Sequence, residues 1–271
     1  MDRARLSCTT LTFAGRLAPK LSAMAGAGFA ATEFWPKDLY DDPGGPDVAL
    51  ALLAESGLRL SCYQALRDYE GMPADEMPRR LDGARQLMDQ MEVVGAELLV
   101  MCSNTSPRAS GDRPRMIDDL CRLGELAAAR NVRIAYECLG WGTWINDYRD
   151  AARLIGEVGH ERIGLNLDCA HIFARDLPLD GVGDIPGDRI FLVEIADLPR
   201  ANLELRELTR HYRLFPGQGV HPVGEFVRRV AATGYRGDYS VEIFNDHYAA
   251  MPPDAVARMA MATTEKLFAS A

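Results

Sequence analysis

Eight short apolar runs recur along the chain, and most neighbouring runs are separated by enough residues for one helix. The runs are rich in β-branched or aromatic residues and span residues 6–13, 30–35, 58–65, 97–103, 132–138, 162–169, 190–196 and 238–244. Between them, segments such as 77–96 and 113–131 repeat apolar residues at i, i+3 and i+4, which predicts amphipathic helices. Strands that alternate with helices pair in parallel through right-handed crossovers. Eight such units therefore favour an α/β fold with a closed (β/α)₈ barrel, the TIM barrel.

Alternative organisations are less consistent with the chain. No GxGxxG string follows the first apolar run, which argues against a Rossmann fold. We find no linker, low-complexity tract or repeat beyond the strand and helix rhythm, so residues 1–271 are predicted to form a single TIM-barrel domain.

The charge balance narrows the class of partner. A net charge of -9 argues against general affinity for nucleic acid or an anionic membrane and leaves a small-molecule substrate as the expected partner. No apolar stretch approaches the roughly 20 residues that span a bilayer, and the first residues lack the apolar core of a signal peptide. We therefore expect a cytoplasmic protein. Barrels of this kind often form homo-oligomers, but one chain reveals no interface.

Four of the runs carry a carboxylate at or near their C-terminal end, namely Glu137, Asp168, Glu194 and Glu242. An acid in a buried strand costs several kcal/mol unless it is paired or ligated. The C-terminal ends of barrel strands converge on one mouth, so these four acids are predicted to meet there. Oxygen ligands without thiolates favour one divalent ion such as Mg²⁺, Mn²⁺ or Co²⁺ over structural zinc.

Several strings give the chain a resemblance to a known family. It resembles the xylose-isomerase-like superfamily of sugar isomerases, epimerases and dehydratases, and within it the bacterial 3-dehydroshikimate dehydratases. The similarity covers almost the whole chain from the second strand onward. Its specific parts are YQALRDYEGM (63–72), MCSNTSP (101–107), YECLGWGTWINDYRDA (136–151), LDCAHIFAR (167–175), IPGDRIFLVEIADLPR (185–200), LTRHYRLFPGQG (208–219) and SVEIFND (240–246).

The resemblance implies a set of site residues. It implies metal binding by the four strand-end acids, residue 194 included, and catalysis by His171. It also implies substrate contacts from Arg67, Thr209 and Arg213, while His211 is a further candidate that either contacts substrate or caps a loop.

These roles fit the dehydration of a cyclic β-hydroxy ketone acid such as 3-dehydroshikimate to protocatechuate. The reaction requires removal of a proton beside the carbonyl, stabilisation of an enolate oxygen and expulsion of hydroxide. A histidine can take the proton and return it to the leaving hydroxyl, while a divalent ion polarises the carbonyl. The guanidinium forks of Arg67 and Arg213 match the geometry of a substrate carboxylate.

Two other functions compete with this hypothesis. A ketose isomerase or epimerase would use Glu137 and Glu242 as paired acid/base catalysts on opposite faces of an enediolate. A carboxylated substrate needs the arginine pair, whereas a neutral sugar does not. The other alternative is a metabolite-binding relative that has lost turnover.

The chain departs from the dehydratase pattern at several positions, among them the string Asp168-Cys169-Ala170-His171, which stands where the dehydratases have DSFH. Glu194 stands where the dehydratases usually have glutamine, and Thr143 and Trp144 replace an arginine and a histidine. A fourth carboxylate makes the site more negative, and like charges this close push one acid toward protonation. We therefore expect either that Glu194 holds a proton near neutral pH or that the site binds its cation more tightly and with less Lewis acidity.

Overall fold

The computed structural model describes residues 2–270, which form a closed barrel of eight parallel strands in the order of the sequence. Each strand pairs with the next along the chain, and β8 pairs with β1 to close the barrel. The strands are β1 (Leu6–Thr9), β2 (Ala31–Phe34), β3 (Arg59–Leu66), β4 (Leu98–Cys102), β5 (Arg133–Glu137), β6 (Ile163–Asp168), β7 (Ile190–Ile195) and β8 (Tyr239–Val241). The predicted (β/α)₈ barrel is thereby confirmed.

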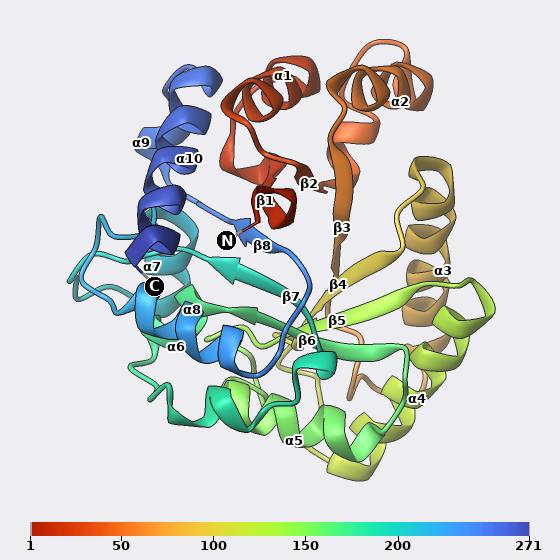
Figure 1. The fold of residues 1–271 in the computed structure, drawn as a ribbon. Helices are drawn as coiled ribbons and strands as arrows, with labels where there is room; N and C mark the ends of the chain where they lie inside the picture. Colours follow the sequence, from red (N-terminus) through yellow and green to blue (C-terminus); the bar gives the residue numbers. More distant parts are fainter. Residues whose placement is uncertain (1, 271) are drawn as a thin grey trace.

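Helices surround the barrel and connect its strands (Figure 1). They are α1 (Leu17–Ala27), α2 (Gly45–Ser56), α3 (Met77–Val94), α4 (Arg113–Ala129), α5 (Tyr148–Val158), α6 (Cys169–Ala174), α7 (Leu205–His211), α8 (Val223–Ala232), α9 (Asp246–Ala249) and α10 (Pro253–Ser270). The last helix, α10, packs against α1, so the two ends of the chain complete one side of the helical layer. No helix within residues 2–270 combines the length and the apolar character needed to cross a membrane.

Local sequence explains where the helices begin and end. The carboxylate of Asp147 accepts a hydrogen bond from the backbone N–H of Arg149 and so caps the start of α5. Gly159 ends the same helix with a φ of 62°, a left-handed conformation that glycine adopts without steric cost. The helix predicted over 113–131 is α4 and ends only two residues earlier.

Side chains alternate along each strand between the barrel interior and the helical layer. Tyr136 and Leu167 belong to the large apolar core between the strands and the helices. Ala135 and Leu192 belong to a second, smaller apolar cluster. Because each acid lies two residues beyond an inward-facing residue, the alternation directs the strand-end acids inward. The extent of the predicted domain over all of residues 1–271 stays a prediction.

Candidate metal centre

The ends of β5 to β8 bring the four predicted acids together. Glu137 and Asp168 are the last residues of β5 and β6, Glu194 lies near the end of β7, and Glu242 directly follows β8. Asp168 and Glu194 are register partners, so neighbouring strands place them side by side. All four are buried, and each offers one carboxylate oxygen within 4.8 Å of the oxygens offered by the others.

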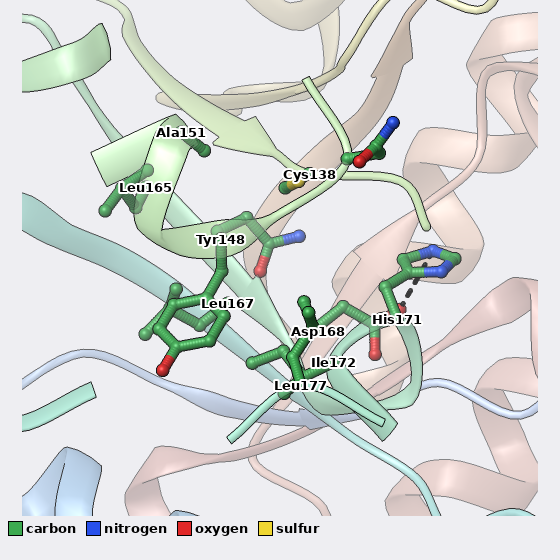
Figure 2. A pocket seen from close by; sticks show the side chains of 11 residues that line it. Cys138, Tyr148, Ala151, Leu165, Leu167, Asp168, His171, Ile172 and Leu177 are labelled. Carbon is green, nitrogen blue, oxygen red and sulfur yellow. Dashed lines mark ion pairs between the residues drawn. The ribbon is translucent and has the colours of Figure 1, made fainter. Parts of the chain in front are cut away.

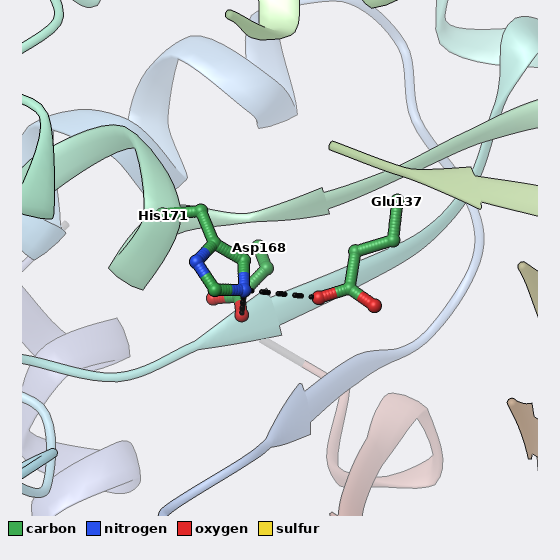
Figure 3. A group of neighbouring side chains, drawn as sticks. All are labelled: Glu137, Asp168 and His171. Atoms are coloured by element: carbon green, nitrogen blue, oxygen red, sulfur yellow. Dashed lines mark ion pairs between the residues drawn. The ribbon is translucent and has the colours of Figure 1, made fainter. Parts of the chain in front are cut away.

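His171 joins this group from the first turn of α6. The Asp168 carboxylate accepts a hydrogen bond from the backbone N–H of Ala170 and starts the helix immediately after β6. His171 Nε2 therefore reaches within 3.2 Å of Glu137 Oε1 and 3.5 Å of Asp168 Oδ2 (Figure 3). The ring of Trp141 packs edge to face against the imidazole, with the ring centroids 4.9 Å apart.

A small cavity lies beside His171, between the β5–α5 region and α6 (Figure 2). Its volume is about 10 Å³, and Cys138, Tyr148 and Asp168 are among the residues that line it. This space is large enough for about one water molecule. Within residues 2–270, the Nδ1 atom of His171 is buried without a hydrogen-bond partner.

Arg213 inserts a buried guanidinium into the acid cluster. Its Nη1 atom lies 2.8 Å from Asp168 Oδ2 and 3.0 Å from Glu242 Oε2, and the side chain is 1% exposed. Nε donates a hydrogen bond to the backbone oxygen of Thr209, and Nη2 lies 3.5 Å from His171 Nε2. Burial opposes the charge on this side chain, but Asp168 and Glu242 outweigh it and raise the pKa of Arg213 above its usual range. Arg213 is therefore a fixed positive charge within the cluster.

The acids differ in their proton affinity. Burial by itself would raise the pKa of Glu137, but the hydrogen bond and charge of His171, together with Cys102 and Arg213, lower that pKa to about 2. Burial raises the pKa of Glu242 well above its usual value, against the opposing effect of Arg213. Burial, followed by the charges of Glu242 and Glu33, also raises the pKa of Glu194. The cluster therefore holds more negative charge than its own cations compensate.

The donor set fits a divalent metal ion. Both carboxylate oxygens of Glu194 are buried, and neither has a hydrogen-bond partner within residues 2–270. Hard carboxylate oxygens are the ligands that small divalent cations prefer, and a buried carboxylate without a donor is costly unless it is ligated or protonated. The four acids, with His171 beside them, are therefore suited to holding such an ion.

The residues predicted to contact substrate lie at different depths. Arg67 follows β3 and is exposed, and its interaction with Cys102 and with the carboxylates of Glu137 and Glu242 raises its pKa. The Thr209 hydroxyl donates to the backbone oxygen of Leu205 within α7.

His211 lies on the surface. Its Nδ1 atom is 3.1 Å from Asp246 Oδ1, and its side chain is 51% exposed. Arg213 therefore lies among the acids, whereas His211 pairs with Asp246 at the surface.

Two of the departures from the dehydratase pattern contact a neighbouring loop. The Thr143 hydroxyl donates to the backbone oxygen of Ser106, and Trp144 Nε1 donates to the backbone oxygen of Ala109. Trp144 covers Gly111, where an added Cβ would lie 2.5 Å from the indole. Both side chains therefore hold the loop after β5 against the loop after β4.

Sequence reasoning missed Glu33, a fifth buried acid near the cluster. It lies on β2, and its Oε2 atom accepts hydrogen bonds from Gln64 Nε2 at 2.6 Å and from Cys62 Sγ at 3.2 Å. Burial raises the pKa of Glu33 to about 7, although Ser240 and Glu194 beside it lower it in part. The available signal was an acid inside the apolar run 30–35.

Sequence reasoning also missed Arg210, on the last turn of α7. Its guanidinium carbon lies 4.5 Å from the centroid of the Phe244 ring, and that of Arg213 lies 4.9 Å from the same ring. The available signal was the RHYR string, which places a second arginine three residues before Arg213, although α7 ends at His211 and only Arg210 is helical.

Comparisons with known proteins show which proteins this chain resembles. A 3-dehydroshikimate dehydratase from Pseudomonas putida is 39% identical over 246 residues, which cover 91% of this chain and 39% of that protein. A solved xylose isomerase-like TIM barrel/4-hydroxyphenylpyruvate dioxygenase fusion protein superposes with a TM-score of 0.94 at 37% identity, over 97% of this chain and 42% of the other. The IolI protein, solved with a zinc atom, superposes with a TM-score of 0.86 at 20% identity over 98% of each chain. At this identity the similarity is one of fold.

The chain spans about two fifths of the length of the dehydratase and of the fusion protein that it matches. The sequence model of one family, the xylose isomerase-like TIM barrel, matches residues 21–267. That match covers most of the chain and the strands that carry the acid cluster. The chain belongs to the xylose isomerase-like TIM barrel family.

Proposed function

We propose that this chain catalyses the metal-dependent dehydration of 3-dehydroshikimate, or of a closely related cyclic hydroxy-keto acid, to protocatechuate and water. The observation that carries the proposal is the cluster of four buried acids, whose oxygens lie within 4.8 Å of one another, with His171 and Arg213 in contact with it. The similarity to a 3-dehydroshikimate dehydratase at 39% identity supports the choice of substrate.

The residues of the cluster can divide the work of the reaction. His171 removes the proton that the ketone acidifies and returns it to the departing hydroxide, so that water leaves and the ring becomes aromatic. With the proton at Nε2, the imidazolium lies 3.2 Å from Glu137 Oε1 and is stabilised by that carboxylate. Arg213 holds Asp168 and Glu242 in place and presents positive charge beside His171.

The four acids would hold one divalent ion, with Mg²⁺, Mn²⁺ and Co²⁺ as the candidates. When bound, such an ion supplies Lewis acidity toward the carbonyl and the enolate oxygen. We further propose Arg67, Thr209, Arg213 and His211 as substrate-binding residues, as the resemblance implies. A cytoplasmic location and association into homo-oligomers stay predictions.

Conversion of 3-dehydroshikimate by purified, metal-loaded protein tests the proposal. We expect the ultraviolet absorption of the aromatic catechol product to appear with at least one of Mg²⁺, Mn²⁺ and Co²⁺. Protein treated with a chelator and the His171→Asn variant are the matched controls, and both should give a flat trace. A flat trace from the wild type with all three metals contradicts the assignment.

The ketose isomerase alternative makes a different prediction. Three arginines near the acids, Arg67, Arg210 and Arg213, suit a carboxylated substrate and have no evident use for a neutral sugar. Epimerisation of a neutral ketose by the metal-loaded protein, without turnover of 3-dehydroshikimate, would favour that alternative.

A further inference from the structure

We propose that Arg210 is a substrate-binding residue that, together with Arg67, binds the carboxylate of the substrate. This inference rests on the proposed function and refines it, because it assigns the recognition of the acidic group to a residue that the sequence resemblance does not name.

The position of Arg210 places its charge at the mouth of the barrel. The side chain is half-buried, and its guanidinium stacks on Phe244, two residues beyond Glu242. The same ring contacts Arg213, whose guanidinium reaches the acids themselves. Phe244 therefore holds one arginine against the metal ligands and a second arginine near them, by cation–π contacts that restrict both side chains.

In the part of the chain that the structure describes, Arg67 and Arg210 are cations without an acidic partner. Within residues 2–270, neither has a carboxylate oxygen within 4.0 Å of its guanidinium nitrogens. Burial and the charge of Arg67 lower the pKa of Arg210, so the two guanidinium groups are close enough to repel each other. Two unpaired like charges held near each other are unfavourable until an anion lies between them, and a carboxylate fits two guanidinium forks.

Arg213 has little donor capacity left for this task. Its Nε donates to Thr209, and its Nη1 atom is shared between Asp168 and Glu242. Its Nη2 faces His171. Arg213 therefore orders the acids and the histidine and has only Nη2 left for a contact with the substrate. Among residues 2–270 the guanidinium groups of Arg67 and Arg210 have no carboxylate partner, so their N–H groups remain for the substrate carboxylate.

Kinetics of the metal-loaded Arg210→Gln variant test this inference. Loss of a charge-assisted contact to the carboxylate is expected to raise KM for 3-dehydroshikimate by about 30-fold, with kcat changed by less than about threefold. Arg210→Lys keeps the charge without the fork and should lie between the wild type and Arg210→Gln. Arg206→Gln is the matched control, because it removes the same charge from an exposed position on the same helix and should leave KM unchanged.

Calorimetric binding of two probes separates carboxylate recognition from turnover. Protocatechuate and catechol share the aromatic diol, and only protocatechuate has a carboxylate. We expect Arg210→Gln to bind protocatechuate at least about tenfold more weakly than the wild type does, with catechol binding unchanged. Circular dichroism of the three variants checks that the fold is retained.

The outcomes distinguish the two proposals. A wild type that does not dehydrate 3-dehydroshikimate, yet loses its preference for protocatechuate over catechol on Arg210→Gln, would reject the proposed function and support this inference. An unchanged preference in Arg210→Gln, or a wild type without any preference, overturns the inference whatever the turnover.

Discussion

The two halves of the barrel treat their buried acids differently. In the first half, Glu33 receives two hydrogen bonds from the side chains of Gln64 and Cys62. In the second half, Glu194 is equally buried, and within residues 2–270 neither of its oxygens has a hydrogen-bond partner. The two acids lie near each other, so the difference comes from the donors around them and not from depth.

Glu70 repeats the pattern of the first half. It lies in the loop after β3, and its Oε1 atom accepts hydrogen bonds from the Tyr136 hydroxyl at 2.7 Å and from the backbone N–H of Asn104 at 2.8 Å. Burial raises its pKa to about 7, with those hydrogen bonds acting in the opposite direction. An acid of this kind can be neutralised by a proton and needs no metal.

The comparison teaches how the chain distinguishes a structural acid from a ligand. Glu33 and Glu70 of the first half each have one oxygen hydrogen-bonded by neutral donors and, within residues 2–270, one buried oxygen without a partner. In the second half, one guanidinium and one imidazole contact Glu137, Asp168 and Glu242, and within the same residues both oxygens of Glu194 lack a partner. A cluster of carboxylates that is short of hydrogen-bond donors and rich in negative charge binds an added cation more favourably than carboxylates that already accept hydrogen bonds. The predictions below test this difference.

The largest expected effect comes from removing a ligand in the second half. Glu242→Gln removes a carboxylate that contacts Arg213 and belongs to the proposed ligand set, so kcat/KM for 3-dehydroshikimate is expected to fall by at least about 1,000-fold. Glu33→Gln changes a carboxyl of similar burial in the first half and should cost less than about tenfold. Initial rates at several Mn²⁺ concentrations measure both variants. Equal losses in the two variants would remove the distinction between the halves.

Much of this arrangement could be predicted from the sequence, because it follows from local periodicity. The alternation of strands and helices predicts the barrel, and the convergence of parallel strand ends predicts that Glu137 and Glu242 meet. The predicted last strand, 238–244, is longer than β8, which ends at Val241, yet Glu242 still reaches the rim.

The remaining features depend on contacts between distant segments. Glu33 is one acid in one strand, and nothing local shows that the side chain of Gln64 will donate a hydrogen bond to it. His211 and Arg210 are adjacent in α7 and therefore point in directions about 100° apart. The rotation of a helix relative to the barrel decides which of the two faces the mouth, and sequence spacing does not contain that rotation.

A smaller effect is expected from the pH dependence of stability in the first half. Glu70 has a folded-state pKa of about 7, above its usual value, so the folded protein binds more protons than the unfolded chain between these two pKa values. Its contribution to stability is therefore fully present below about pH 4.5, falls as the pH rises, and is lost above about pH 7.

Glu70→Gln removes the loss of stability that ionisation of Glu70 causes as the pH rises. The free energy of unfolding of the variant relative to the wild type is expected to rise by up to about 3 kcal/mol between pH 4.5 and pH 8. Urea unfolding at several pH values measures the difference, and Glu92→Gln, at an exposed position of α3, should follow the wild type. A constant difference between Glu70→Gln and the wild type across this range would show that folding does not raise the pKa of Glu70.

The smallest effect concerns the proton on Glu194. Burial and then the charge of Glu242 raise its pKa. We therefore predict that Glu194 holds a proton near neutral pH and releases that proton when a cation binds. Over the pH range in which Glu194 is protonated, the metal affinity of both proteins is compared as the pH rises. For each pH unit, the affinity of the wild type should gain an additional factor of about ten relative to that of Glu194→Gln. Calorimetric titration with Mn²⁺ in buffers of different ionisation enthalpy counts the protons released, and Glu70→Gln is the control that should match the wild type. If Glu194→Gln released as many protons as the wild type and kept the same affinity at every pH, then Glu194 would already be ionised in the metal-free protein. Arg213 alone would then compensate the cluster, and the shortage of donors that separates the second half from the first would carry no consequence for metal binding.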